Sequence, residues 1–396
     1  MWIEREISRE LKEIVESFPV LALIGPRQVG KTSILERIFP EYAYISLDLA
    51  SHAEAAETRS EEFLEQHPPP AIFDEIQYAP SFLRYIKTRV DARKGENGLF
   101  ILTGSQNFML MEAVAESLAG RVAVVPFLGL SASEWKQAED ASRGFRWVDF
   151  LWRGSFPALW AVPDHPPSRE RWYQGYVATY LERDVRNLLN IGSLRDFERF
   201  IRACAARCGQ SLNLSEIGRD VGVSSTTTRQ WLSVLQASNQ ILLLEPYFRS
   251  LGKRLVKTPK LYFTDTGLAA YLMGFSSADA MWTSHQAGAL WENHVISQWL
   301  RWRDWREPST SLWYWRDQAG HEVDLLIEKD QKLIAVECKL TERPGSKDAK
   351  GIKKLEGFYG ETLMQHSYLA CPIEKSFDLD ADVTAVPGWT VWPLDR

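Results

Sequence analysis

The chain has 396 residues, 45% of them hydrophobic and 25% charged, which is the composition of a globular protein with room for two or three domains. Its net charge of −6 excludes a surface coated in positive charge, so nucleic-acid contacts would have to come from a local basic patch. A charged N-terminus and the lack of any apolar run of membrane-spanning length predict a cytoplasmic protein with no membrane partner.

The first 130 residues alternate between strand and helix patterns. The apolar run 19–24 has the composition of a strand buried on both faces, and it is followed by a glycine-rich turn and a helix to residue 38. Further strands are predicted at 42–47, 71–73, 99–103 and 121–126, and further helices at 4–17 and 81–90. This alternation predicts an α/β fold with a parallel sheet.

The turn at residues 25–32, Gly-Pro-Arg-Gln-Val-Gly-Lys-Thr, has the spacing of a phosphate-binding loop. Gly25 and Gly30 allow successive backbone N–H groups, including that of Gln28, to face phosphate oxygens. Lys31 would reach the β- and γ-phosphates of ATP, and the Thr32 hydroxyl would contact Mg²⁺. A chance glycine-rich turn is the alternative, and the flanking strand and helix disfavour it.

Asp74 and Glu75 end the strand at 71–73, where ligands bind in open α/β sheets. We expect Asp74 to hold the magnesium and its water shell and Glu75 to act as general base toward the attacking water. A surface pair of carboxylates without catalytic role is the alternative. The strand at 42–47, lying between loop and Asp74 in the sequence, is typical of ATPases that use a glutamate base.

Two further residues are candidates for contact with the γ-phosphate. Ser105 follows the strand at 99–103 and could sense the phosphate, although an ordinary turn is the alternative. Arg121 precedes the last strand and could act as an arginine finger on the ATP of a neighbouring subunit. A salt bridge within its own subunit is an equally good explanation.

Several motifs together resemble the AAA+ ATPases of bacteria and archaea that carry an uncharacterised C-terminal domain. Four lie in the first 130 residues and three later: 25–32, Phe-Asp-Glu-Ile-Gln (73–77), Thr-Gly-Ser (103–105), Leu-Ala-Gly-Arg (118–121), Tyr-Leu-Glu-Arg-Asp (180–184), Tyr-Phe-Thr-Asp-Thr-Gly-Leu (262–268) and Glu-Val-Asp (322–324). The resemblance spans nearly the whole chain. It implies an ATP-binding P-loop core, residues 1–130, followed by a helical lid or linker, residues 131–208.

Residues 209–258 have the pattern of a winged helix-turn-helix, with helices at 214–221 and 225–235 around a three-residue turn. Ser225, Thr227 and Arg229 would face DNA from the start of the second helix. The segment 246–260 has basic but no acidic residues after Glu245, which suits phosphate contacts: Arg249, Lys253, Arg254, Lys257 and Lys260. Protein contacts or an extension of the lid are the alternatives.

In residues 259–396, Asp324, Glu337 and Lys339 have the form Asp-x12-Glu-x-Lys on two strands that look hairpin-connected. Such strands could bring Asp324 and Glu337 to one Mg²⁺, with Lys339 beside the scissile phosphate and Glu292 as an outer ligand. This resembles the PD-(D/E)xK nuclease fold. A retained fold that no longer cuts, or charges that face solvent, are the alternatives.

The sequence therefore predicts an AAA+ ATPase with a lid, a winged helix and a nuclease-like C-terminal α/β domain. The expected function is ATP hydrolysis, with Mg²⁺, to engage or remodel DNA as a homo-oligomeric ring. An ATP-switched DNA-binding regulator with slow turnover and an ATP-gated, magnesium-dependent nuclease are the two rival hypotheses.

Overall fold

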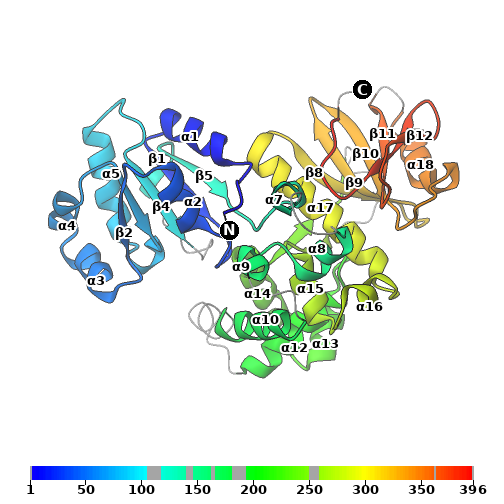
Figure 1. The fold of residues 1–396 in the computed structure, drawn as a ribbon, viewed down its shortest axis with the longest axis horizontal. Helices are drawn as coiled ribbons and strands as arrows, with labels where there is room; N and C mark the ends of the chain where they lie inside the picture. Colours follow the sequence, from blue (N-terminus) through cyan, green and yellow to red (C-terminus); the bar gives the residue numbers. More distant parts are fainter. Residues whose placement is uncertain are drawn as a thin grey trace. The chain divides into compact units, whose positions relative to one another are not determined.

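The computed structural model describes residues 2–104, 117–139, 146–161, 166–180, 193–248, 258–360 and 363–394. The chain divides into two compact units (Figure 1): Met1–Leu130 with Ala237–Asn239, and Ser131–Gln236 with Gln240–Arg396. None of the helices in the described ranges is both long and apolar enough to span a membrane.

The first unit is built on one parallel sheet with the strand order β2-β3-β4-β1-β5. Its elements are α1 Ser8–Ser17, β1 Val20–Ile24, α2 Lys31–Ile38, β2 Ala43–Ser46, α3 Ala50–Thr58, α4 Ser60–Gln66, β3 Ala71–Asp74, the 3₁₀ turn η1 Ile76–Tyr78, α5 Phe82–Ala92, β4 Phe100–Gly104 and β5 Val122–Pro126. All five predicted strands are present.

Every residue of β1, β3 and β4 is buried, as expected for strands covered on both faces. The strand predicted at 42–47 lies between the phosphate loop and Asp74 only in the sequence. In the sheet it is the edge strand β2, and the strand inserted between β1 and β3 is β4. The carboxyl ends of β1, β3 and β4 therefore meet at one edge, which is where the candidate nucleotide residues lie.

The second unit begins with helices and ends in a mixed sheet. Its elements are α7 Ala132–Glu139, α8 Trp147–Arg153, α9 Pro157–Ala161, α10 Pro166–Tyr180, α12 Leu194–Ala205, α13 Leu214–Val221, α14 Ser225–Ala237, β6 Ile241–Leu244, β7 Lys260–Phe263, α15 Thr266–Leu272, α16 Ala278–Trp282, α17 Ala287–Arg306, β8 Ser311–Arg316, β9 Glu322–Lys329, β10 Lys332–Cys338, the 3₁₀ turn η3 Ser346–Ala349, α18 Lys350–Tyr359, β11 Ser367–Cys371, β12 Phe377–Asp378 and β13 Val383–Pro387.

Helices α13 and α14 are joined by a short turn in which Gly222 has a left-handed backbone, with φ of 87°. Asn213 caps α13 by accepting from the Glu216 N–H over 3.1 Å. Strand β6 then pairs with β7 in an antiparallel hairpin, and Ser211 forms an isolated bridge to Lys260 of β7. Two helices and a two-stranded hairpin thus follow one another along this part of the chain.

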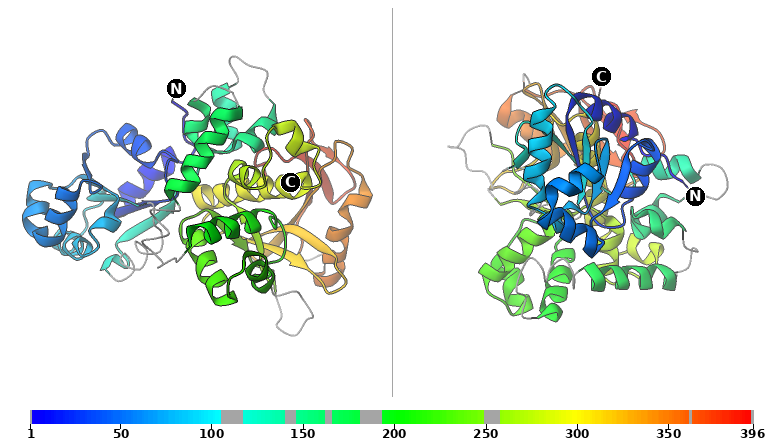
Figure 2. Two further views of the ribbon diagram at one scale, coloured as in Figure 1. Left: turned by 90° about the horizontal axis from the view of Figure 1, so that it is seen from below. Right: turned by 90° about the vertical axis from the view of Figure 1, so that its left-hand side faces the viewer.

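The C-terminal sheet has six strands in the order β12-β13-β11-β10-β9-β8. Strands β8, β9 and β10 are antiparallel neighbours, whereas β10, β11 and β13 run parallel. Helices α17 and α18 lie on opposite sides of this sheet (Figure 2), and Ile352 and Leu355 of α18 join the core beneath it. The predicted hairpin connection of the strands that carry Asp324 and Glu337 is present as β9–β10.

Candidate nucleotide site and C-terminal ion-pair cluster

The phosphate loop follows β1 and ends where α2 begins at Lys31. Gly30 has φ of 94° and Gln28 has φ of 63°, so both adopt the left-handed conformation that turns the loop. A Cβ on Gly25 would lie 1.9 Å from the carbonyl oxygen of Phe127, which follows β5. Glycine is therefore required at position 25 by a close approach of backbone.

Lys31 is buried, and its ammonium donates to the carbonyls of Gly25 at 2.8 Å and Pro26 at 2.9 Å. The Thr32 hydroxyl lies 3.4 Å from Oδ2 of Asp74 at the end of β3. The structure thus brings together the lysine, threonine and aspartate that the sequence assigns to ATP and Mg²⁺. The lysine ammonium fits ATP, because it pairs with phosphate oxygens. The threonine hydroxyl and the aspartate carboxylate fit Mg²⁺, which prefers oxygen ligands.

Two neighbours of Asp74 were missed by sequence reasoning. Tyr44 of β2 donates its hydroxyl hydrogen to Oδ2 of Asp74 over 2.5 Å, and Thr103 of β4 donates to Oδ1. Burial and the Asp74 carboxylate both raise the pKa of the Tyr44 phenol, so it remains a donor at neutral pH. Their positions follow from the strand order, since β2 and β4 flank β3.

Glu75 has a left-handed backbone with φ of 58°, which is unfavourable for a residue with a side chain. Its N–H donates to the Thr103 hydroxyl over 3.3 Å, and its carboxylate accepts from the side-chain amide of Gln77. The backbone therefore turns at Glu75, which directly follows the predicted magnesium ligand Asp74 in the sequence.

Arg5 is a third residue that the sequence did not single out. Its buried guanidinium donates to the carbonyl of Val29 in the phosphate loop at 3.1 Å. The same group donates to the carbonyls of Leu128 at 2.8 Å and Gly129 at 3.2 Å, and it lies 4.1 Å from the centre of the Phe127 ring. Arg5 thus joins the phosphate loop to the segment that follows β5.

The two candidates for the γ-phosphate have different outcomes. Ser105 lies outside the described residues. Arg121 lies before the first residue of β5, at the edge of the sheet opposite the phosphate loop, and its Nε is 2.5 Å from Oδ1 of Asp91. Of the two explanations left open for Arg121, the intrasubunit salt bridge is observed, and a role in trans stays a prediction.

At the start of α14, Ser225 and Arg229 are exposed and Thr227 is half-buried. Ser224 caps the helix by accepting from the Thr227 N–H at 3.1 Å, while its own hydroxyl lies 2.9 Å from that of Thr227. Four of the basic residues predicted to contact DNA lie outside the described residues: Arg249, Lys253, Arg254 and Lys257.

The expectation that Lys260 contacts phosphates is wrong. Only 3% of its side chain is exposed, and it lies among three carboxylates in the second unit. Its Nζ is 2.8 Å from Oε1 of Glu292 and 3.6 Å from Oδ1 of Asp324, and it forms an ion pair with Glu322. A residue that reads as basic surface in the sequence is thus a buried partner of acids.

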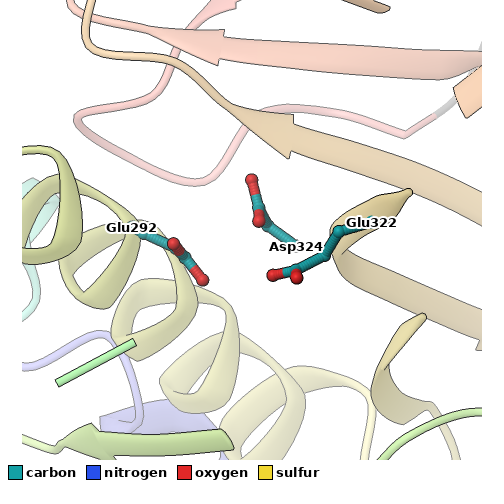
Figure 3. Close-up of side chains that lie close together, drawn as sticks. All are labelled: Glu292, Glu322 and Asp324. Atoms are coloured by element: carbon teal, nitrogen blue, oxygen red, sulfur yellow. The ribbon is translucent and has the colours of Figure 1, made fainter. Parts of the chain in front are cut away.

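Glu292, Glu322 and Asp324 point toward one another from α17 and β9 (Figure 3), and one oxygen of each lies within 4.8 Å of the others. In the described part of the chain this is the one group of three or more acidic, histidine or cysteine side chains spaced to hold a metal. Glu322 was not among the predicted metal ligands, and the sharing of one Mg²⁺ by Asp324 and Glu337 stays a prediction. Lys260 lies within reach of Glu292, Glu322 and Asp324.

The charges of this cluster depend on one another. Burial raises the pKa of the Glu292 carboxyl and Asp324 adds to the rise, whereas Lys260 opposes it. Burial alone lowers the pKa of the Lys260 ammonium, but Glu292, Asp324 and Glu322 outweigh that effect, and the net pKa lies well above its ordinary value. Lys260 is therefore charged at every pH at which the protein would be studied.

Glu337 and Lys339 form an ion pair that interacts electrostatically with this cluster, with Lys339 Nζ 2.6 Å from Glu337 Oε1. Burial and Asp324 raise the pKa of Glu337, and Lys339 opposes the rise. The backbone N–H of Cys338 donates to Oδ2 of Asp324 at 2.8 Å, which fixes the aspartate against β10. Glu322 could have been found in the sequence, because residues i and i+2 of a strand share one face.

Matches to family models divide the chain into three segments. Residues 17–136 match a model described as AAA domain, and residues 145–279 match a domain of unknown function (DUF8612). Residues 287–394 match another domain of unknown function (DUF4143). The first match covers the phosphate loop, Asp74 and Glu75.

Relatives span most of the chain. Uncharacterised proteins of Mycobacterium bovis and Mycobacterium tuberculosis are each 28% identical over 391 residues, which is 98% of this chain and 84% of each relative. Among solved structures, a Walker-type ATPase of Pyrococcus abyssi has 18% identity over 68% of this chain and 96% of its own, with a TM-score of 0.48. DnaA from Aquifex aeolicus bound to AMPPCP covers 59% of this chain and 89% of its own at 14% identity, with a TM-score of 0.33.

The family matches and the geometry of the loop agree on the first unit. The matched segment 17–136 contains the parallel sheet, the phosphate loop and the convergence of Lys31, Thr32 and Asp74. Residues 17–136 thus match an AAA domain in a segment that holds a phosphate-loop geometry, and residues 287–394 match the domain of unknown function DUF4143.

Proposed function

We propose that the chain binds ATP with Mg²⁺ at the phosphate loop and hydrolyses it. The observation that carries this proposal is the meeting of Lys31, Thr32 and Asp74 at the carboxyl edge of the sheet. The Lys31 ammonium would exchange the carbonyls of Gly25 and Pro26 for phosphate oxygens, while Thr32 and Asp74 would hold Mg²⁺. Glu75, next to Asp74, would orient and deprotonate the attacking water.

Two variants separate binding from hydrolysis. Lys31→Ala should weaken binding of a fluorescent ATP analogue, because the loop loses the cation that faces the phosphates. Glu75→Gln should bind the analogue as wild type does but release phosphate far more slowly, since the amide cannot accept a proton. Hydrolysis by Glu75→Gln at the wild-type rate would rule out Glu75 as the base.

We propose that α13, α14 and the β6–β7 hairpin act as a winged helix that binds DNA. The order of two helices and a hairpin supports this, as do the exposed Ser225 and Arg229 at the start of α14. Thr227 is involved in the cap of α14, so its hydroxyl has a local role as well. ATP turnover would then remodel or reposition bound DNA in a homo-oligomer.

The basic segment between β6 and β7 provides the test. Replacing Lys253, Arg254 and Lys257 with Ala should weaken binding of unrelated duplexes alike, and the slope of log affinity against log salt should fall by about 3 if each contacts a phosphate. The control removes the same number of positive charges at Lys347, Lys350 and Lys354, which are exposed. A salt slope that falls equally in both triple variants would contradict a specific DNA contact.

For the last domain we propose a restriction-endonuclease-like fold. The order α17, β8, β9, β10, α18, β11 supports it, since a helix, three antiparallel strands, a helix and a parallel strand make up that fold's core. We do not expect this domain to cleave DNA, because Lys260 lies among the acids that would hold the metal. Incubation of supercoiled DNA with the protein, ATP and Mg²⁺ should leave the DNA intact.

A further inference from the structure

The three acids that could hold a metal already surround a cation that belongs to the chain itself. The Lys260 ammonium is 2.8 Å from Glu292 and 3.6 Å from Asp324, and it is paired with Glu322. Its three N–H donors match three carboxylates in number, so one ammonium can satisfy all of them. With 3% of the side chain exposed, water has little access to this contact.

The size of the group is that of a site for a single cation. The acidic oxygens lie within 4.8 Å of one another, a spacing that oxygens around one divalent ion at ~2.0–2.6 Å can adopt. A divalent ion placed there would lie within a few ångströms of the ammonium, and the two positive charges would repel each other strongly in a buried setting. Glu292, Glu322 and Asp324 therefore do not fit a resident metal at their centre while Lys260 remains in place.

We infer that the Lys260 ammonium is the resident cation of the Glu292, Glu322 and Asp324 cluster, standing where a divalent metal would otherwise bind. The ion pairs of this cluster hold strand β7 of the hairpin against α17 and β9 of the C-terminal domain. Lys260 is the first residue of β7, and the Tyr262 hydroxyl of the same strand also donates to Oε1 of Glu292. Two residues on one face of the hairpin strand thus hold α17.

The same cluster has a second basic neighbour at its edge. Arg316 of β8 lies 3.3 Å from the other carboxylate oxygen of Glu322, Oε2. Each carboxylate of the group therefore has a donor from outside the group, whether a lysine, an arginine, a tyrosine or the Cys338 N–H. This pattern is that of a satisfied structural network, in which removal of one charge leaves the others uncompensated.

The test uses the nucleotide-free full-length protein and Mn²⁺, with binding followed by electron paramagnetic resonance and by the melting temperature. Wild type should show no Mn²⁺ binding that depends on Asp324. Lys260→Met removes the ammonium but keeps most of the side-chain volume, so it should gain one Mn²⁺ site at least tenfold tighter than any in wild type. Asp324→Asn in that background should abolish the new site.

Lys329→Met is the matched control, because Lys329 also pairs with an acid of the same unit, Glu307, at 3.0 Å. It should gain no Mn²⁺ site. If Lys260→Met is unstable, refolding with Mn²⁺ should recover it, since the cation replaces the missing charge. The inference is overturned by wild-type Mn²⁺ binding that Asp324→Asn removes, by a folded Lys260→Met that binds no Mn²⁺, or by a Lys260→Met that Mn²⁺ does not rescue.

Discussion

The Tyr44 hydroxyl and the Asp74 carboxylate are joined by a 2.5 Å hydrogen bond across the edge of the parallel sheet. The oxygen that accepts it, Oδ2, is also the one 3.4 Å from the Thr32 hydroxyl. Tyr44 therefore orients the aspartate that we assign to Mg²⁺, in the way that outer hydrogen bonds orient metal ligands elsewhere.

Replacement of Tyr44 by Phe tests this relationship. The variant keeps the ring, which is partly exposed, but removes the hydrogen bond that fixes Asp74. We expect the Mg²⁺ concentration that gives half-maximal ATP hydrolysis to rise about fivefold, which corresponds to about 1 kcal/mol, the typical net contribution of one hydrogen bond. ATP-analogue binding without Mg²⁺ should stay unchanged. If binding of the analogue without Mg²⁺ changes while the Mg²⁺ dependence of hydrolysis does not, Tyr44 acts on the nucleotide and its hydrogen bond to Asp74 does not serve the metal.

Gly25→Ala tests the close approach of Phe127 to the phosphate loop. The new methyl group would lie 1.9 Å from the Phe127 carbonyl, so the backbone must move, at a cost of roughly 1–3 kcal/mol or more by analogy with overpacked cores. Denaturant unfolding of the nucleotide-free protein should show this loss. Gly95→Ala, at a position with φ of 86° and open space around it, reports backbone strain alone and should cost clearly less.

Arg121 offers a test that separates a salt bridge from an arginine finger. Mixing Arg121→Ala subunits with Glu75→Gln subunits should restore some turnover if Arg121 acts on a neighbour, because some boundaries then combine an intact base with an intact arginine. Asp91→Asn breaks the ion pair but keeps the arginine, and it should retain activity. An Asp91→Asn variant as inactive as Arg121→Ala, with no recovery on mixing, would assign the arginine to its salt bridge.

His294 predicts a pH dependence of stability. Burial lowers its pKa to about 4, which the Trp389 carbonyl opposes and Arg301 reinforces. Above pH 6.5 the imidazole is neutral in both states, and the stability due to this group is fully present. As the pH falls from 6.5 to about 4 the unfolded chain takes up the proton first, so up to about 3 kcal/mol should be lost.

His294→Gln checks that assignment. The Gln amide can still donate to the Trp389 carbonyl, which accepts from His294 Nε2 at 2.7 Å, but it does not titrate. In the difference between the unfolding free energies of wild type and variant, the contributions of the other titrating groups cancel. This difference should favour wild type above pH 6.5 and shift toward the variant as the pH falls to 4. A difference that is independent of pH would show that His294 does not titrate in this range.

The sequence predicted the parts of the nucleotide site that are local. Gly30, Lys31 and Thr32 follow one another where the phosphate loop passes into α2, and Asp74 ends a strand recognisable by its apolar run. Tyr44 and Thr103 were not predicted, because their closeness to Asp74 depends on which strands flank β3. Nothing in the spacing of strands along a chain determines that order.

Lys260 shows the same limit in the second unit. In the sequence it ends a run of basic residues, and charge alone favours a solvent-facing position. Only the pairing of β7 with β6 and the packing of α17 against β7 place it beside Glu292. The carboxylate Glu292, 32 residues away, gave no local signal of this partner.

The contact between Gly25 and Phe127 has a mechanical consequence. Strand β5 is the last strand of the ATPase sheet, and the chain leaves that sheet through Phe127, Leu128 and Gly129, which are bonded to β1 and to Arg5. Arg5 also holds Val29 of the phosphate loop. If the phosphate loop changes conformation when it binds a triphosphate, it would therefore displace Phe127, Leu128 and Gly129 directly. A structural change on nucleotide binding would then pass to the residues after 129 through these three residues, and no other part of the sheet would have to move.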